Sequence, residues 1–170
     1  ARSEVKHIML VPNQIISPQK NGPIIGLVQD SLLGCRLLTL KNTFLNRNEM
    51  MNLMMCIIHT KKNIVLPPPC IMIPKKNIYL WSGKQVFSLF LPEINYDFTT
   101  EAAEKGWEWM PRMDTRIIIH DGNLLAGILD KRTVGQSEKS LAHVVINSWD
   151  KDMARDFLSQ TQLVVNSWLE

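Results

Sequence analysis

The sequence predicts an α+β fold of small mixed sheets and hairpins, short helices and two helices at the C-terminal end. The clearest strand signal is the pair Asp121-Gly122 between two apolar segments, which predicts a β-hairpin within residues 116–129. The clearest helix signal is an apolar stripe in the second of two C-terminal helical stretches, formed by Met153, Phe157, Val164 and Trp168. At 170 residues, of which 45% are hydrophobic, the chain is expected to form one domain with its own core.

The net charge of +3 is distributed unevenly along the chain. Residues 1–85 hold 11 Lys and Arg against 3 Asp and Glu, a balance of +8, whereas residues 86–170 hold 8 against 13, a balance of −5. A basic first half indicates contact with an anion such as nucleic acid or nucleotide phosphate, although scattered lysines also serve as solubilising surface. The sequence pI of about 8.8 is lower than is typical of a free-standing nucleic-acid-binding domain.

Three cysteines, Cys35, Cys56 and Cys70, are spaced widely and irregularly. An odd number with such spacing predicts reduced, buried thiols in an intracellular protein rather than disulfides. The four histidines lie far apart and the sequence has no CxxC or HxxxH motif, so we expect no metal site. The polar residues 1–6 predict no signal peptide, and no apolar run approaches the ~18 residues of a membrane span.

At the N-terminal end, residues 2–10 are predicted to be helical and to lead into an extended segment, VPNQIIS. Pro12 explains the break, because a proline disfavours helical backbone at the residue before it, here Val11. Two turn signals follow, Ser17-Pro18 and Asn21-Gly22-Pro23, and they enclose a polar loop.

Residues 24–28 form a short apolar run that predicts a strand. Gly26 interrupts it, and a glycine in such a run indicates that another backbone or a ligand approaches closely. The run ends at Gln29 and Asp30, where Asp30 is expected to cap the next helix. An amide and a carboxylate at the end of a strand could bind a ligand. The simpler interpretation is a core strand followed by a helix cap, with no ligand.

Asn48 is expected to cap a helix through the sequence EMMNLMMCII. The helix is predicted to be buried on most sides, because its polar residues form only one narrow stripe of Glu49, Asn52, Cys56 and His59. The clustered methionines are typical of adaptable core packing. A stiff LPPPC connector and a short apolar IMIP segment follow.

Residues 80–91 predict a helix that Ser82 caps and Pro92 ends. Lys84 falls in its first turn, where free backbone N–H groups and the positive end of the helix attract anions. A lysine there is repelled by the positive end of the helix dipole, and a bound phosphate would offset that small cost. Gly83-Lys84 is not a nucleotide-binding P-loop, because position 78 is Ile where that motif needs Gly.

Residues 93–114 are acidic, aromatic and aperiodic, with Trp107 and Trp109 flanking Glu108. We predict that they form a surface excursion of low functional content. Beyond the hairpin, the final helix reaches Glu170 without a stop signal.

These motifs together resemble the pore domain of the largest subunit of multisubunit RNA polymerases, of the eukaryotic, archaeal or large-DNA-virus type. The matching residues follow the family's order along almost the whole chain: Ser17-Pro18-Gln19, Pro23, Gly26, Gln29-Asp30, Gly34, Leu38-Thr39, Thr43-Phe44, Leu80-Trp81-Ser82-Gly83-Lys84-Gln85, Asp121-Gly122, Gly127, Lys131, Thr133-Val134-Gly135, His143-Val144-Val145, Val164-Val165-Asn166 and Trp168-Leu169. Residues 45–65 and 93–114 depart from the family's pattern, so the resemblance implies no role for them.

The resemblance implies a fragment of DNA-directed RNA polymerase, a DNA-binding nucleotidyltransferase complex that acts in transcription. In this family the domain walls the pore beneath the active centre, where nucleotides enter and the RNA 3′ end is extruded on backtracking. The family's NADFDGD loop, whose aspartates hold the catalytic Mg²⁺, is missing from the sequence. The chain alone is therefore expected to bind no cofactor and to be inactive, with Mg²⁺ held in the assembled polymerase.

By the same resemblance, residues 1–170 are a single pore-type domain, and residues 136–170 are a helical part that leads toward a funnel domain absent from this chain. The expected partners are the rest of the largest subunit, the second-largest subunit, the other polymerase subunits, the RNA 3′ end and nucleoside triphosphates, with no membrane. The expected compartment is the nucleus, or a cytoplasmic viral factory or virion.

The resemblance also assigns residues to the pore wall. Gln29 and Asp30 are expected near the catalytic centre, and Lys84 with Gln85 is expected to contact triphosphate or extruded RNA. Lysine acts in that role as a point charge. Ser17 and Gln19 are further candidates for the same wall.

Two other hypotheses remain open from the residues alone. The chain could be a stand-alone module whose basic first half binds nucleic acid and whose last helix docks a protein. It could also be an unrelated acid–base hydrolase that uses Asp30, His120 and Asp121, although Asp-Gly in a hairpin is usually a turn.

Overall fold

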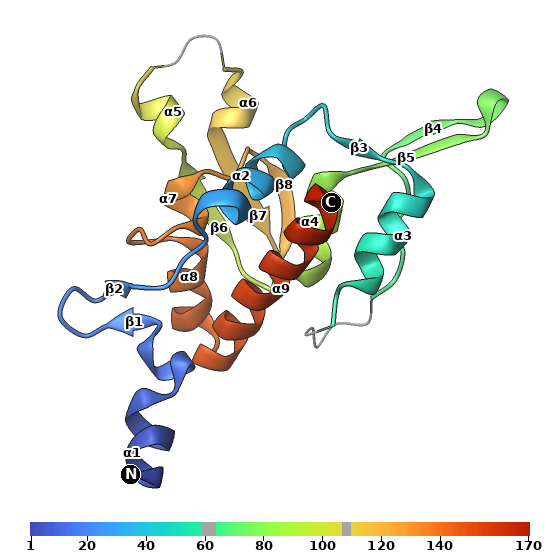
Figure 1. Ribbon diagram of the computed structural model, residues 1–170. Helices are drawn as coiled ribbons and strands as arrows, with labels where there is room; N and C mark the ends of the chain where they lie inside the picture. The colour runs from blue at the N-terminus through green and yellow to red at the C-terminus, as the bar shows by residue number, and fades with distance from the viewer. Residues whose placement is uncertain (59–63, 107–109) are drawn as a thin grey trace.

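The structure is a computed structural model that describes residues 1–58, 64–106 and 110–170 (Figure 1). Over these residues, short helices combine with three small antiparallel sheets, which confirms the α+β fold. The longest helix, α9 (Lys151–Leu169), crosses the middle of the molecule and packs against α2 (Gln29–Leu38), α4 (Gly83–Phe90) and α8 (Leu141–Ser148). None of the described helices is long and apolar enough to cross a membrane.

The N-terminal segment is helical as far as Met9, because α1 (Arg2–Glu4) continues into a π-helical stretch, η1 (Val5–Met9). The break falls at Leu10, whose backbone is extended at φ −63° and ψ 132°. The prediction of an extended segment after it is wrong for η2 (Val11–Gln14), which is a 3-10 helix. Pro12 lies in the first turn of η2, where its fixed φ suits a helix and its missing N–H is not needed.

The predicted polar loop is the turn of a small hairpin, in which β1 (Ile16–Ser17) pairs antiparallel with β2 (Gly22–Pro23). The strand expected over residues 24–28 is absent. Instead of pairing with a strand, this segment bonds through the Leu27 N–H to the carbonyl of Val134, at 2.9 Å.

Helix α2 begins at Gln29, so the prediction that Asp30 caps it is wrong. Val28 is the N-cap, with an extended backbone at φ −136° and ψ 164°. Asp30 lies inside the first turn, where its negative charge interacts favourably with the positive end of the helix dipole. Gln29 itself has a φ of +50°, in the left-handed region that non-glycine residues rarely occupy.

The cap of α3 (Arg47–Met55) is Asn46 rather than the predicted Asn48. The Glu49 carboxylate accepts a hydrogen bond from the Asn46 N–H at 2.8 Å and completes a capping box. Because β3 (Phe44–Leu45) ends directly before Asn46, the chain turns into the helix two residues earlier than predicted.

Only one face of α3 is buried, so the prediction that this helix is buried on most sides is wrong. Met50 and Leu53 pack into the core, but Met51 and Met55 are 44% and 81% exposed. Some of the clustered methionines therefore pack in the core and others lie on the surface. The predicted polar stripe extends to His59, which lies outside the described residues.

The segment before α4 forms a sheet rather than the start of the predicted helix. β5 (Ile78–Ser82) pairs with β3 on one side and with β4 (Ile71–Ile73) on the other. The short 3-10 helix η3 (Pro74–Lys76) joins β4 to β5, and this hairpin projects from the body of the molecule (Figure 1). Ser82 ends β5 and caps α4, as predicted.

The prediction that residues 93–114 form a surface excursion is wrong for the part of the region that joins a sheet and reaches the core, although many of its described residues are exposed. Its strand β6 (Tyr96–Thr99) forms the edge of a sheet, followed by the short helices α5 (Glu101–Glu104) and α6 (Arg112–Thr115). Ile94, Tyr96, Thr100, Ala102 and Asp114 are all buried. The predicted flanking pair Trp107 and Trp109 lies outside the described residues.

The predicted hairpin is confirmed by β7 (Arg116–His120) and β8 (Asn123–Ala126), which pair antiparallel. Asp121 and Gly122 have φ values of +51° and +72° between the two strands. Left-handed backbone at both central residues is what a tight hairpin turn of this kind requires. β6 pairs with the other edge of β7 and completes the sheet.

The C-terminal helices follow a short helix, α7 (Lys131–Val134). The predicted stripe of α9 is confirmed, because Phe157 and Val164 are buried, and Met153 and Trp168 pack partly buried against the core.

The cysteines are all free thiols, but they are not all buried as predicted. Cys35 is buried in α2, Cys56 is partly buried and Cys70 is exposed. Burial raises the pKa of the Cys35 thiol to about 12, because a thiolate would lose its hydration there.

We expect thiol-modifying reagents at neutral pH to label Cys70 rapidly in the folded protein and to leave Cys35 unmodified, since only the thiolate is nucleophilic. Mass spectrometry of timed samples measures both sites. Equal labelling rates at Cys35 and Cys70 would contradict the placement of Cys35 in the core.

The close approach predicted at Gly26 is confirmed, because an added Cβ would lie 2.5 Å from the carbonyl carbon of Gly135. We expect Gly26→Val to lower the free energy of unfolding by about 3 kcal/mol, since backbone on both sides must move. Urea denaturation measures the change. Gly22→Ala is the control, because its Cβ would meet no atom closer than 3.6 Å. A Gly26→Val variant as stable as the parent would show that the approach is not close.

Candidate functional site

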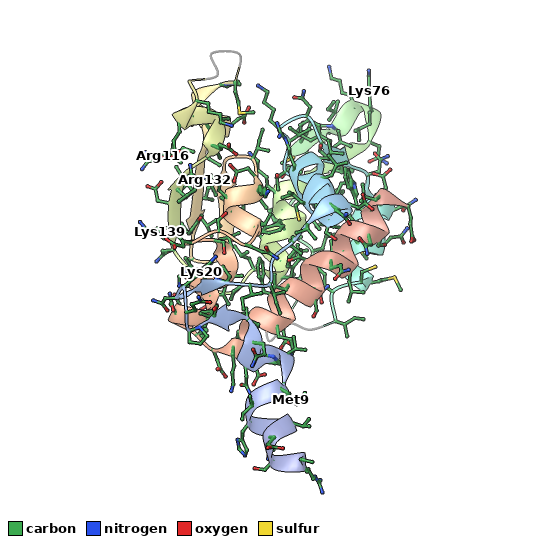
Figure 2. The ribbon with its side chains drawn as sticks, turned by 60° about the vertical axis from the view of Figure 1, so that its left-hand side comes forward. Met9, Lys20, Lys76, Arg116, Arg132 and Lys139 are labelled. Carbon is green, nitrogen blue, oxygen red and sulfur yellow. The ribbon has the colours of Figure 1, made fainter. Side chains whose placement is uncertain are left out.

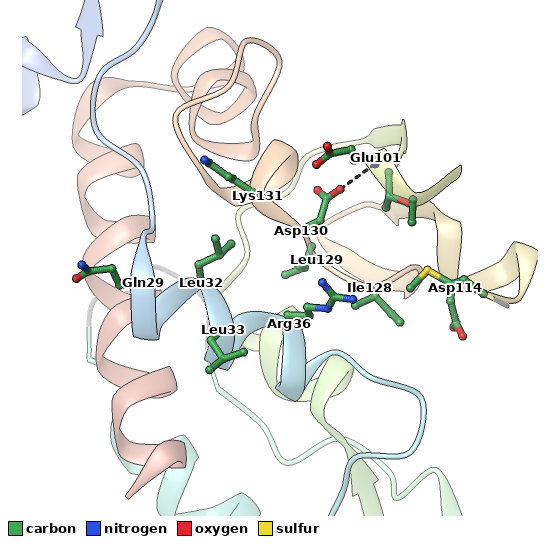
Figure 3. Close-up of a pocket in the computed structure, with 13 residues that line it drawn as sticks. Gln29, Leu32, Leu33, Arg36, Glu101, Asp114, Ile128, Leu129, Asp130 and Lys131 are labelled. Carbon is green, nitrogen blue, oxygen red and sulfur yellow. Dashed lines mark hydrogen bonds between the residues drawn. The ribbon is translucent and has the colours of Figure 1, made fainter. Parts of the chain in front are cut away.

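A cleft of about 290 Å³ lies between α2 and the segments that precede α5 and α7 (Figure 3). One face of α2 forms the first wall and carries Gln29, Leu32, Leu33 and Arg36. These residues are spaced i, i+3, i+4 and i+7, which places them on the same side of a helix. The opposite side of α2 carries the buried residues Gly34, Cys35 and Leu38, and α2 packs against α9 at Gly34.

The second wall is the segment that runs from β8 into α7, with Ile128, Leu129, Asp130 and Lys131. A hydrogen bond joins it to α2, because the Leu129 N–H donates to the buried Thr39 hydroxyl at 3.1 Å. The Thr39 hydroxyl in turn donates to the Cys35 carbonyl of α2 at 2.8 Å. The two walls are therefore held together through the Thr39 hydroxyl.

Asp130 connects the second wall to the start of α5. One carboxylate oxygen accepts the Thr133 N–H at 3.0 Å and caps α7. The other accepts the Glu101 N–H, also at 3.0 Å. Both oxygens thus accept backbone N–H groups, so Asp130 fixes the shape of the cleft.

The other two acidic residues of the cleft have cationic partners outside it. Glu101 pairs with Lys105 at 2.6 Å, and this hydrogen bond is the main cause of the lowered pKa of Glu101. Asp114 is buried and pairs with Lys41 at 3.6 Å. By contrast, Arg36 and Lys131 have no carboxylate within salt-bridge distance among the described residues.

Lys84 lies half-buried in the first turn of α4, as predicted, and close enough to Asp114 to be affected by its charge. Burial lowers the pKa of Lys84, because the ammonium group loses hydration, and the Asp114 carboxylate raises it by a smaller amount. The folded protein therefore holds this cation at a net electrostatic cost.

Gln85, the neighbour of Lys84, has its side chain occupied within the chain. Its Oε1 accepts the Ser82 N–H at 3.0 Å, which closes the capping box of α4. Its Nε2 donates to the carbonyl of Pro68 at 2.8 Å and fixes the proline-rich connector. A structural role explains Gln85 fully, and its predicted pore contact stays a prediction.

The structure does not gather the other predicted site residues around Lys84. Gln29 lines the cleft, while the neighbouring Asp30 is exposed on α2 and does not line it. Ser17 and Gln19 belong to the β1–β2 hairpin, where the Ser17 hydroxyl accepts the Gln19 N–H at 3.3 Å. Their assignment to the pore wall stays a prediction.

Sequence reasoning missed most of the cleft. Leu32, Leu33 and Arg36 continue the helical spacing from Gln29, and that signal was available in the sequence. Lys131 and Asp114 are far from α2 along the chain and share no sequence motif with it. Only the fold brings them to α2.

Two basic residues of the first half stand far apart in the structure. Lys20 and Lys76 lie at widely separated parts of the molecule in Figure 2. Lys20 shares one edge with Lys139, Arg132 and Arg116, but Arg132 and Arg116 are ion-paired with Glu104 and Asp97. This arrangement gives no support to a stand-alone nucleic-acid-binding module.

The hydrolase hypothesis gains no support either. Asp121 lies in the β7–β8 turn, where its N–H donates to the Asn95 side chain at 2.8 Å, and neither it nor His120 or Asp30 lines the cleft. Among the described residues, no group of three His, Cys, Asp or Glu side chains is placed to hold a metal ion.

A comparison with known protein families decides between the hypotheses. The family model described as RNA polymerase Rpb1, domain 3, matches residues 14–170. The chain belongs to this family. It is a part of the largest subunit of DNA-directed RNA polymerase, a nucleotidyltransferase, and it assembles with other polymerase subunits. The match includes residues 45–65 and 93–114, where the sequence departs most from the expected pattern.

The unfavourable position of the Lys84 charge leads to a test of stability. We expect Lys84→Met to melt at the same temperature as the parent or higher, since the variant removes a desolvated cation and Asp114 keeps Lys41. Lys41→Met is the matched comparison, and we expect it to lose about 1 kcal/mol, because a buried carboxylate loses its ion-pair partner. Scanning calorimetry measures both. A clear loss of stability in Lys84→Met would show that Lys84 serves the fold.

Proposed function

We propose that this Rpb1 domain 3 forms part of the wall of the polymerase pore, where nucleoside triphosphates enter and backtracked RNA leaves. Lys84 is the residue that carries the proposal. A cation kept in a half-buried position, at a cost that Asp114 only partly offsets, is typical of a functional charge rather than a stabilising one.

The local geometry suits an anion that binds weakly and moves on. Lys84 lies at the positive end of α4, so its charge adds to that of the helix N-terminus. The nearby Asp114 reduces the net positive charge and keeps the attraction for phosphate modest. A pore needs such moderate attraction, because a tightly held triphosphate or RNA end would block it.

Gln29 and Asp30 belong to the same proposal as polar groups at the start of α2, on the side toward the catalytic centre. Neither side chain is buried, and Asp30 has no ion-pair partner among the described residues. The catalytic Mg²⁺ requires the aspartate loop of the family, which this sequence does not contain. We therefore propose that the chain supports polymerisation without performing it.

The test uses assembled polymerase that carries Lys84→Met. We expect the apparent affinity for nucleoside triphosphates to fall roughly tenfold, or cleavage of backtracked transcripts to change by a similar factor, since a hydrogen bond to a charged group contributes about 1.5–3 kcal/mol. Single-nucleotide addition and transcript-cleavage kinetics measure the two effects.

Lys84→Arg is the control and should retain most of the activity, because it keeps the charge. Subunit composition of the purified enzyme shows whether assembly is intact. Unchanged kinetics in a fully assembled Lys84→Met enzyme would remove Lys84 from the pore wall.

A further inference from the structure

We propose that the β4–β5 hairpin inserts into a protein surface of the assembled polymerase, where an apolar slot covers both faces of the hairpin and carboxylates meet its tip. The hairpin projects from the body of the molecule (Figure 1), and Lys76 marks its tip in Figure 2. The proposal goes beyond the pore wall and does not depend on the contact assigned to Lys84.

The first observation is that the hairpin carries large apolar side chains on both of its faces. Residues that lie directly opposite one another in an antiparallel pair share a face, and the next pair along the strands lies on the other face. Met72 pairs with Tyr79, and these side chains are 60% and 39% exposed. Ile73 pairs with Ile78 on the other face, and these are 41% and 36% exposed. Neither face is therefore the polar, solvated face that an antiparallel sheet commonly has.

The described part of the chain leaves both faces uncovered. None of these four side chains belongs to the hydrophobic core or packs against it within residues 1–58, 64–106 and 110–170. The third strand of the sheet, β3, pairs with β5 only at Trp81 and Ser82, beyond the exposed pairs. Two strands alone are marginally stable in water, and exposed apolar patches of this kind mark interaction surfaces.

The base of the hairpin is held firmly, so its direction is set before a partner binds. Trp81 is only 3% exposed, and its Nε1 donates to the Pro67 carbonyl at 2.7 Å. The Cys70 N–H donates to the Leu80 carbonyl at 2.9 Å and extends the pairing toward the body. A segment that is already ordered loses less conformational entropy on binding, which favours a docking arm over a loose loop.

The second observation concerns charge. Lys75 and Lys76 are exposed at the tip, and neither has a carboxylate within salt-bridge distance among the described residues. The sequence has no Asp or Glu anywhere in residues 50–92, so no acid close in sequence offsets these charges. Carboxylates on the partner complement them.

The placement of the side chains favours a protein over a nucleic acid. A surface that follows a nucleic acid backbone carries its cations along the whole contact, because each neutralises a phosphate. Here both lysines lie at the tip, and the faces behind them are apolar. Methionine and tyrosine are enriched in protein interfaces, whose rims are polar. Met72 and Tyr79 therefore suit the centre of such an interface, and the two lysines suit its edge.

Photocrosslinking in the assembled polymerase tests the proposal. Met72→p-benzoylphenylalanine and Ile73→p-benzoylphenylalanine place the probe on opposite faces of the hairpin. Leu125→p-benzoylphenylalanine is the control, at a 63% exposed position of β8. We expect positions 72 and 73 to crosslink to segments of the same polypeptide, outside residues 1–170, that contain apolar and acidic residues. Position 125 should not crosslink to these segments. Mass spectrometry identifies the crosslinked peptides.

Substitution at the tip separates charge recognition from proximity. Lys75→Glu combined with Lys76→Glu should reduce both crosslinks about tenfold, because like charges then face one another. Lys75→Arg combined with Lys76→Arg should keep them. Subunit composition of each purified enzyme is measured in parallel. Loss of the crosslinked polypeptide from the glutamate variant alone would also support the proposal.

Several results would overturn the proposal. They are no crosslink from the hairpin, a crosslink from only one face, a crosslink to nucleic acid, to a second copy of this chain or to a segment without acidic residues, and crosslinks that the glutamates do not weaken. Lys84 is unchanged in all of these variants, so the pore proposal stands or fails separately.

Discussion

The structure depends on the close approach of α2 to its neighbours at points where a side chain would not fit. A Cβ at Gly34 would lie 2.2 Å from Val165 Cγ1 of α9, and one at Gly83 would lie 2.0 Å from the carbonyl oxygen of Leu38. Gly26 adds a third approach just before the helix. Protein interiors transmit such constraints because they are closely packed, so α2 has little freedom to shift. Its one open face becomes the cleft wall, and its C-terminal end sets where α4 and Lys84 begin.

The sequence predicted the features whose chemistry lies within a few neighbouring residues. Ser82, the predicted cap, is three residues from the Gln85 that completes its capping box, and Asp121-Gly122 forms a turn by itself, so both features depend only on neighbouring residues. The wrong predictions concern segments that distant partners control. β6 pairs along the edge of β7, and in residues 24–28 the Leu27 N–H bonds to Val134 of helix α7 rather than to a strand.

The site was predictable to the same degree. Lys84 was predicted as a site residue because it belongs to a contiguous motif at a helix start, and Gln29 because it ends an apolar run; the pore contact of both stays a prediction. Arg36 and Lys131 were missed because they are almost a hundred positions apart and meet only across the folded cleft. The exact position of a helix cap is harder to predict from sequence. Asn46 and Asn48 have the same side chain, and Asn46 is the cap because β3 ends directly before it.

Asp114 connects the cleft to Lys84. It lines the cleft and is also the charge that raises the pKa of Lys84. Because Asp114 is buried, little water lies around its carboxylate to weaken the attraction for the Lys84 ammonium. Asp114 divides that attraction between Lys84 and its ion-pair partner Lys41. The burial of Lys84 is therefore offset only in part, and the chain keeps its charge at the start of α4 without a carboxylate of its own.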